Sequence, residues 1–190
     1  MDLYKKHLYL NKDIENIVSK EIIEYDIKSA GFNLIKRFKL LSDSQINYLE
    51  SLNRESRHRA IGLIERDDKS LSEKLNKCFE KVRKEFFEAN DIDEDEILSI
   101  KKDAIFCLKR CHNLQFDNVE FVEKNVYTSY YYLAKNEFYV GNNTLDVKGI
   151  SDDKLTLHRD YMVDFLFNIF KMFEVAFLGL SNKIATVCKI

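Results

Sequence analysis

The chain has 190 residues, of which 45% are hydrophobic and 33% charged, a balance typical of a globular protein that excludes a disordered polypeptide. Its formal net charge of -2 excludes a global attraction to nucleic acid, so any basic surface must be local. The amino-terminal segment is charged, and the four cysteines need no oxidising compartment, so a cytoplasmic location with free thiols is expected.

The first 66 residues contain two predicted strands and four predicted helices. In chain order they are a strand, a helix, a strand and three helices: 7–10, 12–20, 21–26, 29–41, 42–52 and 54–66. Asn11 is a candidate cap for the first of these helices. The second strand is β-branched and aromatic and ends at Asp26, which places a carboxylate at a strand end.

The clearest predicted helix starts at Ser70. Its apolar residues recur at spacings of three and four and form one face: Leu71, Leu75, Cys78, Phe79, Val82 and Phe86. An acidic turn (DIDEDE) follows at 91–96, and residues 97–110 predict either two strands with a tight turn near 101–103 or one bent strand. Three more strands and a turn are predicted further along: 119–122, 126–133, 137–140 and 142–143.

The segment 161–180 is very apolar and raises the question of a membrane span. Four polar residues interrupt it at helical spacing: Asp164, Asn168, Lys171 and Glu174. A charge at the centre of a spanning helix costs roughly 2.5–3.5 kcal/mol, so we expect no membrane insertion. The segment instead predicts a long apolar C-terminal helix with more apolar surface than one face needs. That surplus favours self-association or a protein partner.

Strands and helices follow one another in blocks rather than as alternating βαβ units. This order predicts an α+β fold with an antiparallel sheet flanked by helices. Lys, Asn and Ile are abundant, which is typical of an AT-rich genome such as that of a phage.

Two acidic motifs resemble the palm of family-B DNA polymerases. Asp26-Ile27-Lys28-Ser29 follows a predicted strand and is similar to the family's D-x-x-S motif. Asp103, in the predicted hairpin, holds the place of the second aspartate of D-T-D-S. Three later segments resemble elements that lead to the thumb: Thr128-Ser129-Tyr130, Lys148-Gly149-Ile150 and Arg159-Asp160. The resemblance covers roughly residues 21–165.

The resemblance implies a division of the chain and a site. It implies a palm-like domain over 1–150, with a helical insertion at about 29–66, and a thumb-like helical segment over 151–190 packed on it. Asp26 and Asp103 would be catalytic and, with the carbonyl oxygen of Ile27, would hold Mg²⁺ or Mn²⁺. The residues expected to bind nucleotide or nucleic acid are Ser29, Arg54, Arg57, Arg59, Arg66, Tyr130 and Lys148.

Two positions depart from the family pattern. Lys101 stands where the family has the first aspartate of D-T-D-S, and Gly31 replaces a tyrosine. The fingers motif of the family is absent as well. Each aspartate alone is more often a turn or cap residue than a ligand.

Three functions therefore stay open. The first is a DNA-directed nucleotidyltransferase of phage type that acts in DNA replication on nucleic acid and nucleoside triphosphate. The second is a catalytically inactive, palm-derived binding subunit of a larger complex. The third is a phage protein that blocks a host enzyme through the acidic turn at 91–96.

Overall fold

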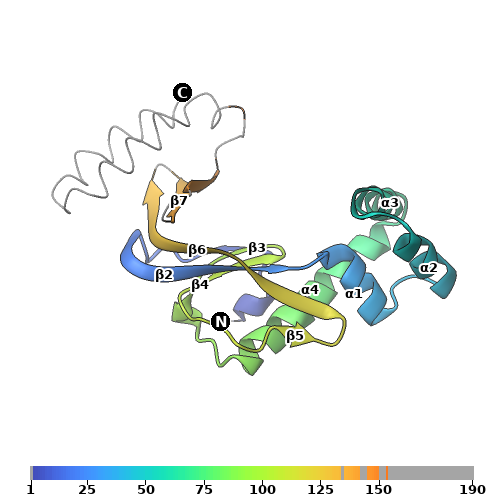
Figure 1. The fold of residues 1–190 in the computed structure, drawn as a ribbon, viewed down its shortest axis with the longest axis horizontal. Helices are drawn as coiled ribbons and strands as arrows, with labels where there is room; N and C mark the ends of the chain where they lie inside the picture. Colours follow the sequence, from blue (N-terminus) through green and yellow to red (C-terminus); the bar gives the residue numbers. More distant parts are fainter. Residues whose placement is uncertain (1, 134, 142–144, 150–152, 154–190) are drawn as a thin grey trace. The chain divides into compact units, whose positions relative to one another are not determined.

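The computed structural model describes residues 2–133, 135–141, 145–149 and 153 (Figure 1). The C-terminal helix predicted over 151–190 and the turn predicted at 142–143 thus lie outside the described residues, apart from Asp153. No helix in the described part of the chain is long and apolar enough to cross a membrane.

The chain divides into two compact units. Unit 1 comprises residues 1–11 and 23–125, and unit 2 comprises residues 12–22 and 126–190. Two of the three boundaries fall inside long strands, β2 (Asn16–Ile27) and β6 (Val119–Leu133), which contribute residues to both units, and the third lies between residues 11 and 12.

Unit 1 holds four α-helices and most of the strands. Its helices are α1 (Ala30–Phe38), α2 (Asp43–Ser51), α3 (Arg54–Asp67) and α4 (Lys69–Ala89), with short 3₁₀ helices η1 (Leu3–Lys5) and η2 (Glu94–Glu96). Its own strands are β1 (Leu8–Leu10), β3 (Ile97–Lys101), β4 (Ala104–Cys107) and β5 (Gln115–Phe116). The strands β1, β3, β4 and β2 lie in that order and pair antiparallel, which confirms the predicted mixed fold with an antiparallel sheet.

The helices of unit 1 begin where the sequence supplies caps. Ser42 and Gln45 form a reciprocal capping box at the start of α2, and Asn53 and Asp68 cap α3 and α4. Every residue of the apolar face predicted for α4 is buried. This face packs on the sheet, where the Phe86 ring stacks on that of Phe121 at a centroid distance of 4.2 Å.

The helix predicted over 12–20 is wrong. Residues 16–20 belong to β2, a strand that is hydrogen-bonded between its neighbours β4 and β6. Just before it, the Glu15 carbonyl accepts a 2.8 Å hydrogen bond from the Tyr132 N–H. Pairing with strands distant in the sequence thus overrides the local preference, which is weak in such a short segment.

Unit 2 contains the first part of β2, the second part of β6, β7 (Asn136–Val140) and β8 (Leu145–Lys148). The strand predicted over 137–140 is confirmed, whereas the β8 strand was missed. The rings of Tyr127 and Tyr130 lie 5.3 and 5.1 Å from that of Tyr139, and the Tyr127 hydroxyl is hydrogen-bonded to Asp146. These aromatic side chains of β6 and β7 therefore form part of the core of this unit.

Phe86 is fully buried, whereas its neighbour Phe87 is only half-buried. We expect Phe86→Ala to lower the free energy of unfolding by about 3–5 kcal/mol, because it removes a ring and leaves a cavity. Urea unfolding followed by circular dichroism measures this loss. Phe87→Ala is the matched control with a smaller expected loss, and equal losses would contradict the described packing.

Candidate functional site

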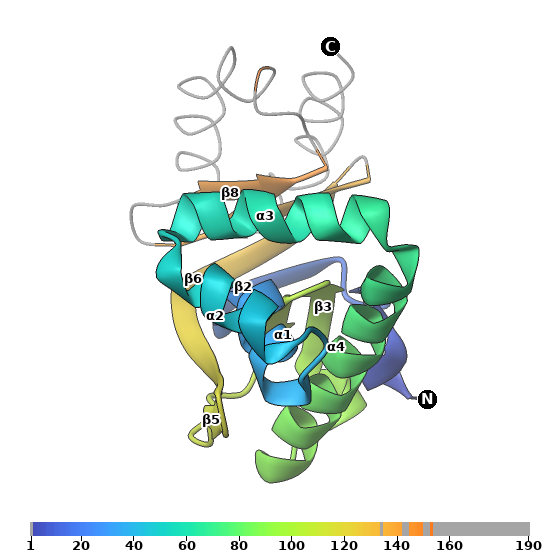
Figure 2. The ribbon, with the colours of Figure 1, turned by 90° about the vertical axis from the view of Figure 1, so that its right-hand side faces the viewer.

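A pocket of about 570 Å³ opens in unit 1 where β2 ends and α1 begins. Its polar walls come from the end of β2, the start of α1, the first half of α3 and the turn between β3 and β4. Leu75 and Phe79 of α4 add an apolar surface. Helix α3 contacts α1, α2 and α4 (Figure 2). These contacts hold the first turns of α3 beside the pocket.

The structure brings Asp26 and Asp103 together at this pocket. Asp26 is in register with Ala104, the residue that follows Asp103, and the Ile27 N–H donates a 3.3 Å hydrogen bond to the Asp103 carbonyl. Burial raises the pKa of the Asp103 carboxyl, and the negative charge of Asp26 raises it further. The two carboxylates are therefore close enough to interact, as metal-binding pairs are.

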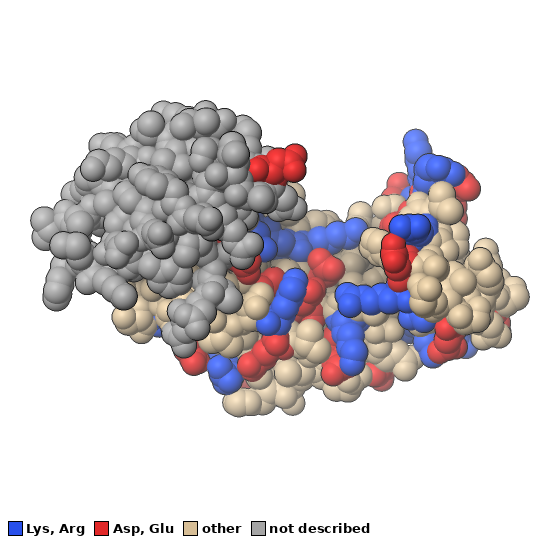
Figure 3. Space-filling model, turned by 45° about the horizontal axis from the view of Figure 1, so that its top comes forward, with Lys and Arg blue, Asp and Glu red and all other residues tan. Residues whose placement is uncertain are grey.

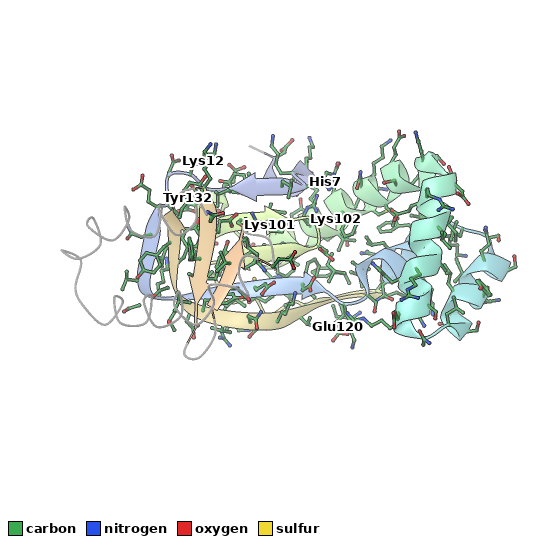
Figure 4. All side chains as sticks on the ribbon, turned by 90° about the horizontal axis from the view of Figure 1, so that it is seen from above. His7, Lys12, Lys101, Lys102, Glu120 and Tyr132 are labelled. Carbon is green, nitrogen blue, oxygen red and sulfur yellow. The ribbon has the colours of Figure 1, made fainter. Side chains whose placement is uncertain are left out.

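A buried arginine holds the turn that carries Asp103. Arg83 of α4 is fully buried, and its Nη1 donates a 2.6 Å hydrogen bond to the Lys102 carbonyl while its Nε donates to the Tyr4 carbonyl at 2.9 Å. Burial lowers the pKa of Arg83 to about 10, which leaves the side chain charged at neutral pH. Lys102 has a left-handed backbone (φ 55°), and its N–H donates to the His7 carbonyl at 2.7 Å (Figure 4). Sequence analysis missed Arg83, although its position four residues after Phe79 and three before Phe86 places it on the apolar face of α4.

Three side chains of the pocket, those of an arginine, a histidine and a lysine, are available to a ligand. Arg54, His58 and Lys102 are exposed and line the pocket, and none has an ion-pair partner among the described residues. Elsewhere basic and acidic side chains are interspersed on the face that Figure 3 shows. These three side chains form a local group in the pocket, whose lining also includes Glu55 and Glu65.

Arg57 also lines the pocket, but most of its donors are used within the protein. Its Nε donates to the Leu49 carbonyl and its Nη2 to the Leu52 carbonyl, both at 2.8 Å. Its guanidinium carbon lies 4.3 Å from the centre of the Phe32 ring. Arg57 thus satisfies the free carbonyls at the end of α2 and fixes the wall of the pocket.

The start of α1 adds a second feature that suits anions. Ser29 is the N-cap of α1 in a left-handed conformation (φ 48°), and its side chain makes no capping hydrogen bond. Ser29, Ala30 and Gly31 all line the pocket. The first N–H groups of a helix have no intrahelical partner and carry partial positive charge, so this wall favours phosphate or carboxylate groups.

Four residues predicted to bind nucleotide or nucleic acid are not part of the pocket lining. Arg59 and Arg66 are exposed on α3 and pair with Glu55 and Asp67 at 2.6 and 3.3 Å. Tyr130 and Lys148 belong to unit 2. The Tyr130 side chain is fully buried, a position from which the ring does not stack on a base.

One more lysine contacts the site from β6. The Lys124 Nζ lies 3.2 Å from the Asp26 Oδ2 and 3.4 Å from the Glu24 Oε1. Glu24 is 2% exposed, and its other oxygen accepts a 2.7 Å hydrogen bond from Asn125. Sequence analysis also missed this contact, because it joins two strands that are a hundred residues apart.

The side chains fit an open cation site rather than a closed one. No group of three or more His, Cys, Asp or Glu side chains that could hold a metal occurs among the described residues. Asp26 and Asp103 supply two carboxylates, and Ile27 lines the same pocket. Mg²⁺ is commonly held by one or two carboxylates, with substrate phosphates and water completing its shell. The donor set therefore suits a cation that binds together with a phosphate ligand.

The raised pKa of Asp103 has a consequence for stability. The Asp103 carboxyl has a higher pKa in the folded chain than its ordinary value of 3.8 in the unfolded chain. The folded chain therefore loses stability as pH rises from 3.8 through the higher folded pKa, because the unfolded chain releases this proton first. We expect Asp103→Asn to raise the midpoint of urea unfolding at pH 7 and to flatten the acidic part of the stability profile. Asp95→Asn, in the exposed acidic turn, serves as the neutral control. A lower midpoint for Asp103→Asn at pH 7 would contradict the assignment.

Comparison with known proteins gives one family. The model of the family described as bacteriophage PBS1 gene 130 protein matches residues 1–179. No curated protein matches the chain. The family description supports the phage association predicted from composition, whereas it names no polymerase, so the polymerase resemblance stays a prediction. The chain belongs to the bacteriophage PBS1 gene 130 protein family.

Proposed function

We propose that this phage protein binds the phosphate groups of a nucleotide or of a nucleic-acid end in the pocket of unit 1, together with a divalent cation. Asp26 and Asp103 would hold the cation, and the start of α1 with Arg54 and Lys102 would hold the phosphates. The observation that carries the proposal is that the two carboxylates and the basic side chains without ion-pair partners line one pocket.

The charges explain why a cation belongs in the proposal. Two carboxylates at a pocket repel a phosphate ester, and they also repel one another, as the raised pKa of Asp103 indicates. A divalent cation removes both repulsions, because it is attracted to carboxylate and phosphate oxygens alike. Arg54 and Lys102 then neutralise the charge that the cation leaves on the phosphates.

Nucleotidyl transfer is the reaction that such a site would support. A hydroxyl oxygen of the acceptor attacks the α-phosphorus of a nucleoside triphosphate and forms the new P–O bond. The bond from this phosphorus to the bridging oxygen breaks, pyrophosphate leaves with the bonding electron pair, and the hydroxyl proton goes to solvent. A bound divalent cation would stabilise the charge on the attacking and leaving oxygens.

Binding without transfer is the second candidate, and two observations favour it. Lys101 occupies the place of a carboxylate in the motif that the hairpin resembles. Lys124 already neutralises part of the charge of Asp26. A palm-derived binding subunit would keep the phosphate pocket and lose the chemistry. A protein partner or a second copy of the chain at the C-terminal segment belongs to the same candidate.

Arg54 and Arg66 allow a matched test of phosphate binding. Both arginines are exposed on α3, but only Arg54 lines the pocket, and the partner of Arg66, Asp67, does not line it either. We expect Arg54→Ala to weaken Mg²⁺-dependent binding of a fluorescent deoxynucleoside triphosphate about tenfold, which corresponds to about 1.4 kcal/mol. Arg66→Ala should leave the affinity unchanged. Titration by fluorescence anisotropy at fixed salt measures both, and equal effects of the two substitutions would rule out the pocket.

Primer extension and terminal nucleotide addition with Mg²⁺ or Mn²⁺ separate the two candidates. For the enzyme, we expect incorporation by the wild-type chain and none by Asp103→Asn, because the cation would lose a charged ligand. Incorporation that survives Asp103→Asn would exclude this aspartate from the reaction. Nucleotide binding without incorporation under either metal would select the binding subunit.

A further inference from the structure

One face of α3 lines the pocket with side chains whose character changes along the helix. The four residues at helical spacing are Arg54, His58, Ile61 and Glu65. Residues three and four apart lie above one another on a helix, so these side chains share one face. Arg54 and His58 are exposed, Ile61 is buried and Glu65 is half-buried. Along this helix the pocket therefore has a basic end, an apolar middle and an acidic end.

The apolar middle of the pocket is built from three helices. A Cβ atom added to Gly31 of α1 would lie 3.9 Å from the Ile61 Cγ2, so these two residues are neighbours in the lining. Leu75 and Phe79 of α4 line the same pocket and are each 3% exposed. The Lys102 ammonium lies 5.6 Å from the centre of the Phe79 ring, which places a basic group beside this apolar surface. An enclosed apolar surface with a few polar groups suits a ring system rather than a phosphate group alone.

The two glutamates of the lining differ in their partners. Glu55 pairs with Arg59 at 2.6 Å, whereas Glu65 forms no ion pair with another described residue. The uncompensated charge of Glu65 repels phosphate groups from its end of the pocket. A ligand is therefore oriented with its phosphates toward Arg54, and its remaining atoms extend over Ile61. Glu65 can then accept a hydrogen bond from a ring N–H or an amino group.

The surface beside the pocket does not offer a track for a nucleic-acid strand. On α1 and α3 the described basic side chains outside the lining are all paired with acids: Lys36 with Glu50, Arg37 with Glu85, Arg59 with Glu55 and Arg66 with Asp67. Tyr48, the exposed aromatic side chain among the described residues, is not part of the lining. A strand is commonly held by a continuous basic groove and by exposed aromatic rings on which its bases stack.

We propose that the pocket takes a free nucleotide rather than the end of a nucleic-acid chain, with the base against Gly31, Ile61 and Phe79 and the phosphates toward Arg54. The inference rests on the proposed function and selects one of its two ligand classes. The volume of about 570 Å³ lies within the range of small-molecule sites, roughly 300–1,000 Å³. A strand that continued beyond the pocket would meet basic side chains that are already neutralised.

Competition against a fluorescent deoxynucleoside triphosphate tests the inference on the full chain. The three competitors are the unlabelled nucleotide, a short oligonucleotide with a 5′-triphosphate, and inorganic triphosphate, all at the same Mg²⁺ and salt concentrations. The oligonucleotide carries the same base and phosphates plus a continuing strand, and inorganic triphosphate lacks the base. We expect the free nucleotide to compete best, and each of the other two to bind at least about tenfold more weakly.

Two helical glycines locate the base. Gly31 lines the pocket, whereas Gly62 of α3 does not, and a Cβ atom added to Gly62 would meet nothing within 4 Å. We expect Gly31→Leu to weaken binding of the nucleotide about tenfold and to leave inorganic triphosphate unaffected, because the new side chain fills the space of the base. Gly62→Leu, the matched control, should change neither affinity.

The outcomes separate the inference from the proposed function. An oligonucleotide or an inorganic triphosphate that competes as well as the free nucleotide would overturn the inference and leave phosphate binding intact. Equal weakening of nucleotide and inorganic triphosphate by Gly31→Leu would also overturn it, because the base would not lie beside Gly31. No binding of any of the three ligands would overturn both. If Gly31→Leu does not fold by circular dichroism, the competition on the wild-type chain decides alone.

Discussion

The antiparallel pairing of β2 with β4 is the constraint on which the site depends. It sets Asp26 in register with the first residue of β4 and so places it beside the turn that carries Asp103. A slip of one residue would send Asp26 to the opposite face of the strand. The carboxylate pair, its repulsion and the pocket beside it all follow from this register.

The buried charge of Arg83 stabilises this register at the turn between β3 and β4. Arg83 ties the Lys102 carbonyl to the Tyr4 carbonyl, and the His7 carbonyl accepts from Lys102 on the other side. The guanidinium is buried, and three kinds of contact offset its desolvation: hydrogen bonds to the two carbonyls, a 3.4 Å contact between its Nη2 and the His7 Nδ1, and the negative charge of Glu80. The protein thus buries the charge of Arg83, which is unfavourable, and this side chain fixes the turn that carries Asp103. The charge of Asp103 is unfavourable as well. Such costs recur at functional sites.

Sequence patterns predicted the local parts of this fold well. The helices α1 to α4 were all predicted, α4 from its spacing of apolar residues, and the strands β3 and β4 were predicted with a tight turn between them. The first part of β2 was assigned to a helix, because its strand state depends on partners that lie far away in the sequence. Local propensity has no information on those partners.

The residues of the candidate site likewise divide into those that sequence patterns predicted and those that they missed. Asp26, Ser29, Arg54, Arg57 and Asp103 were proposed from motif order or charge, and the fold brings them to one pocket. Arg83 and Lys124 act through contacts across the fold, and no spacing in the chain indicates their partners, although Arg83 lies on the apolar face of α4. Arg57 was chosen for its charge, but its contacts show that it closes the end of α2.

The chain passes from one unit to the other three times, at residues 11–12, 22–23 and 125–126. Neither unit is a continuous piece of polypeptide, so no single cut or truncation yields either one intact. A chain that ends at residue 125 would still carry residues 12–22, deprived of the strand segment that completes their pairing. A simple fusion at one point of the chain would therefore transfer neither unit intact.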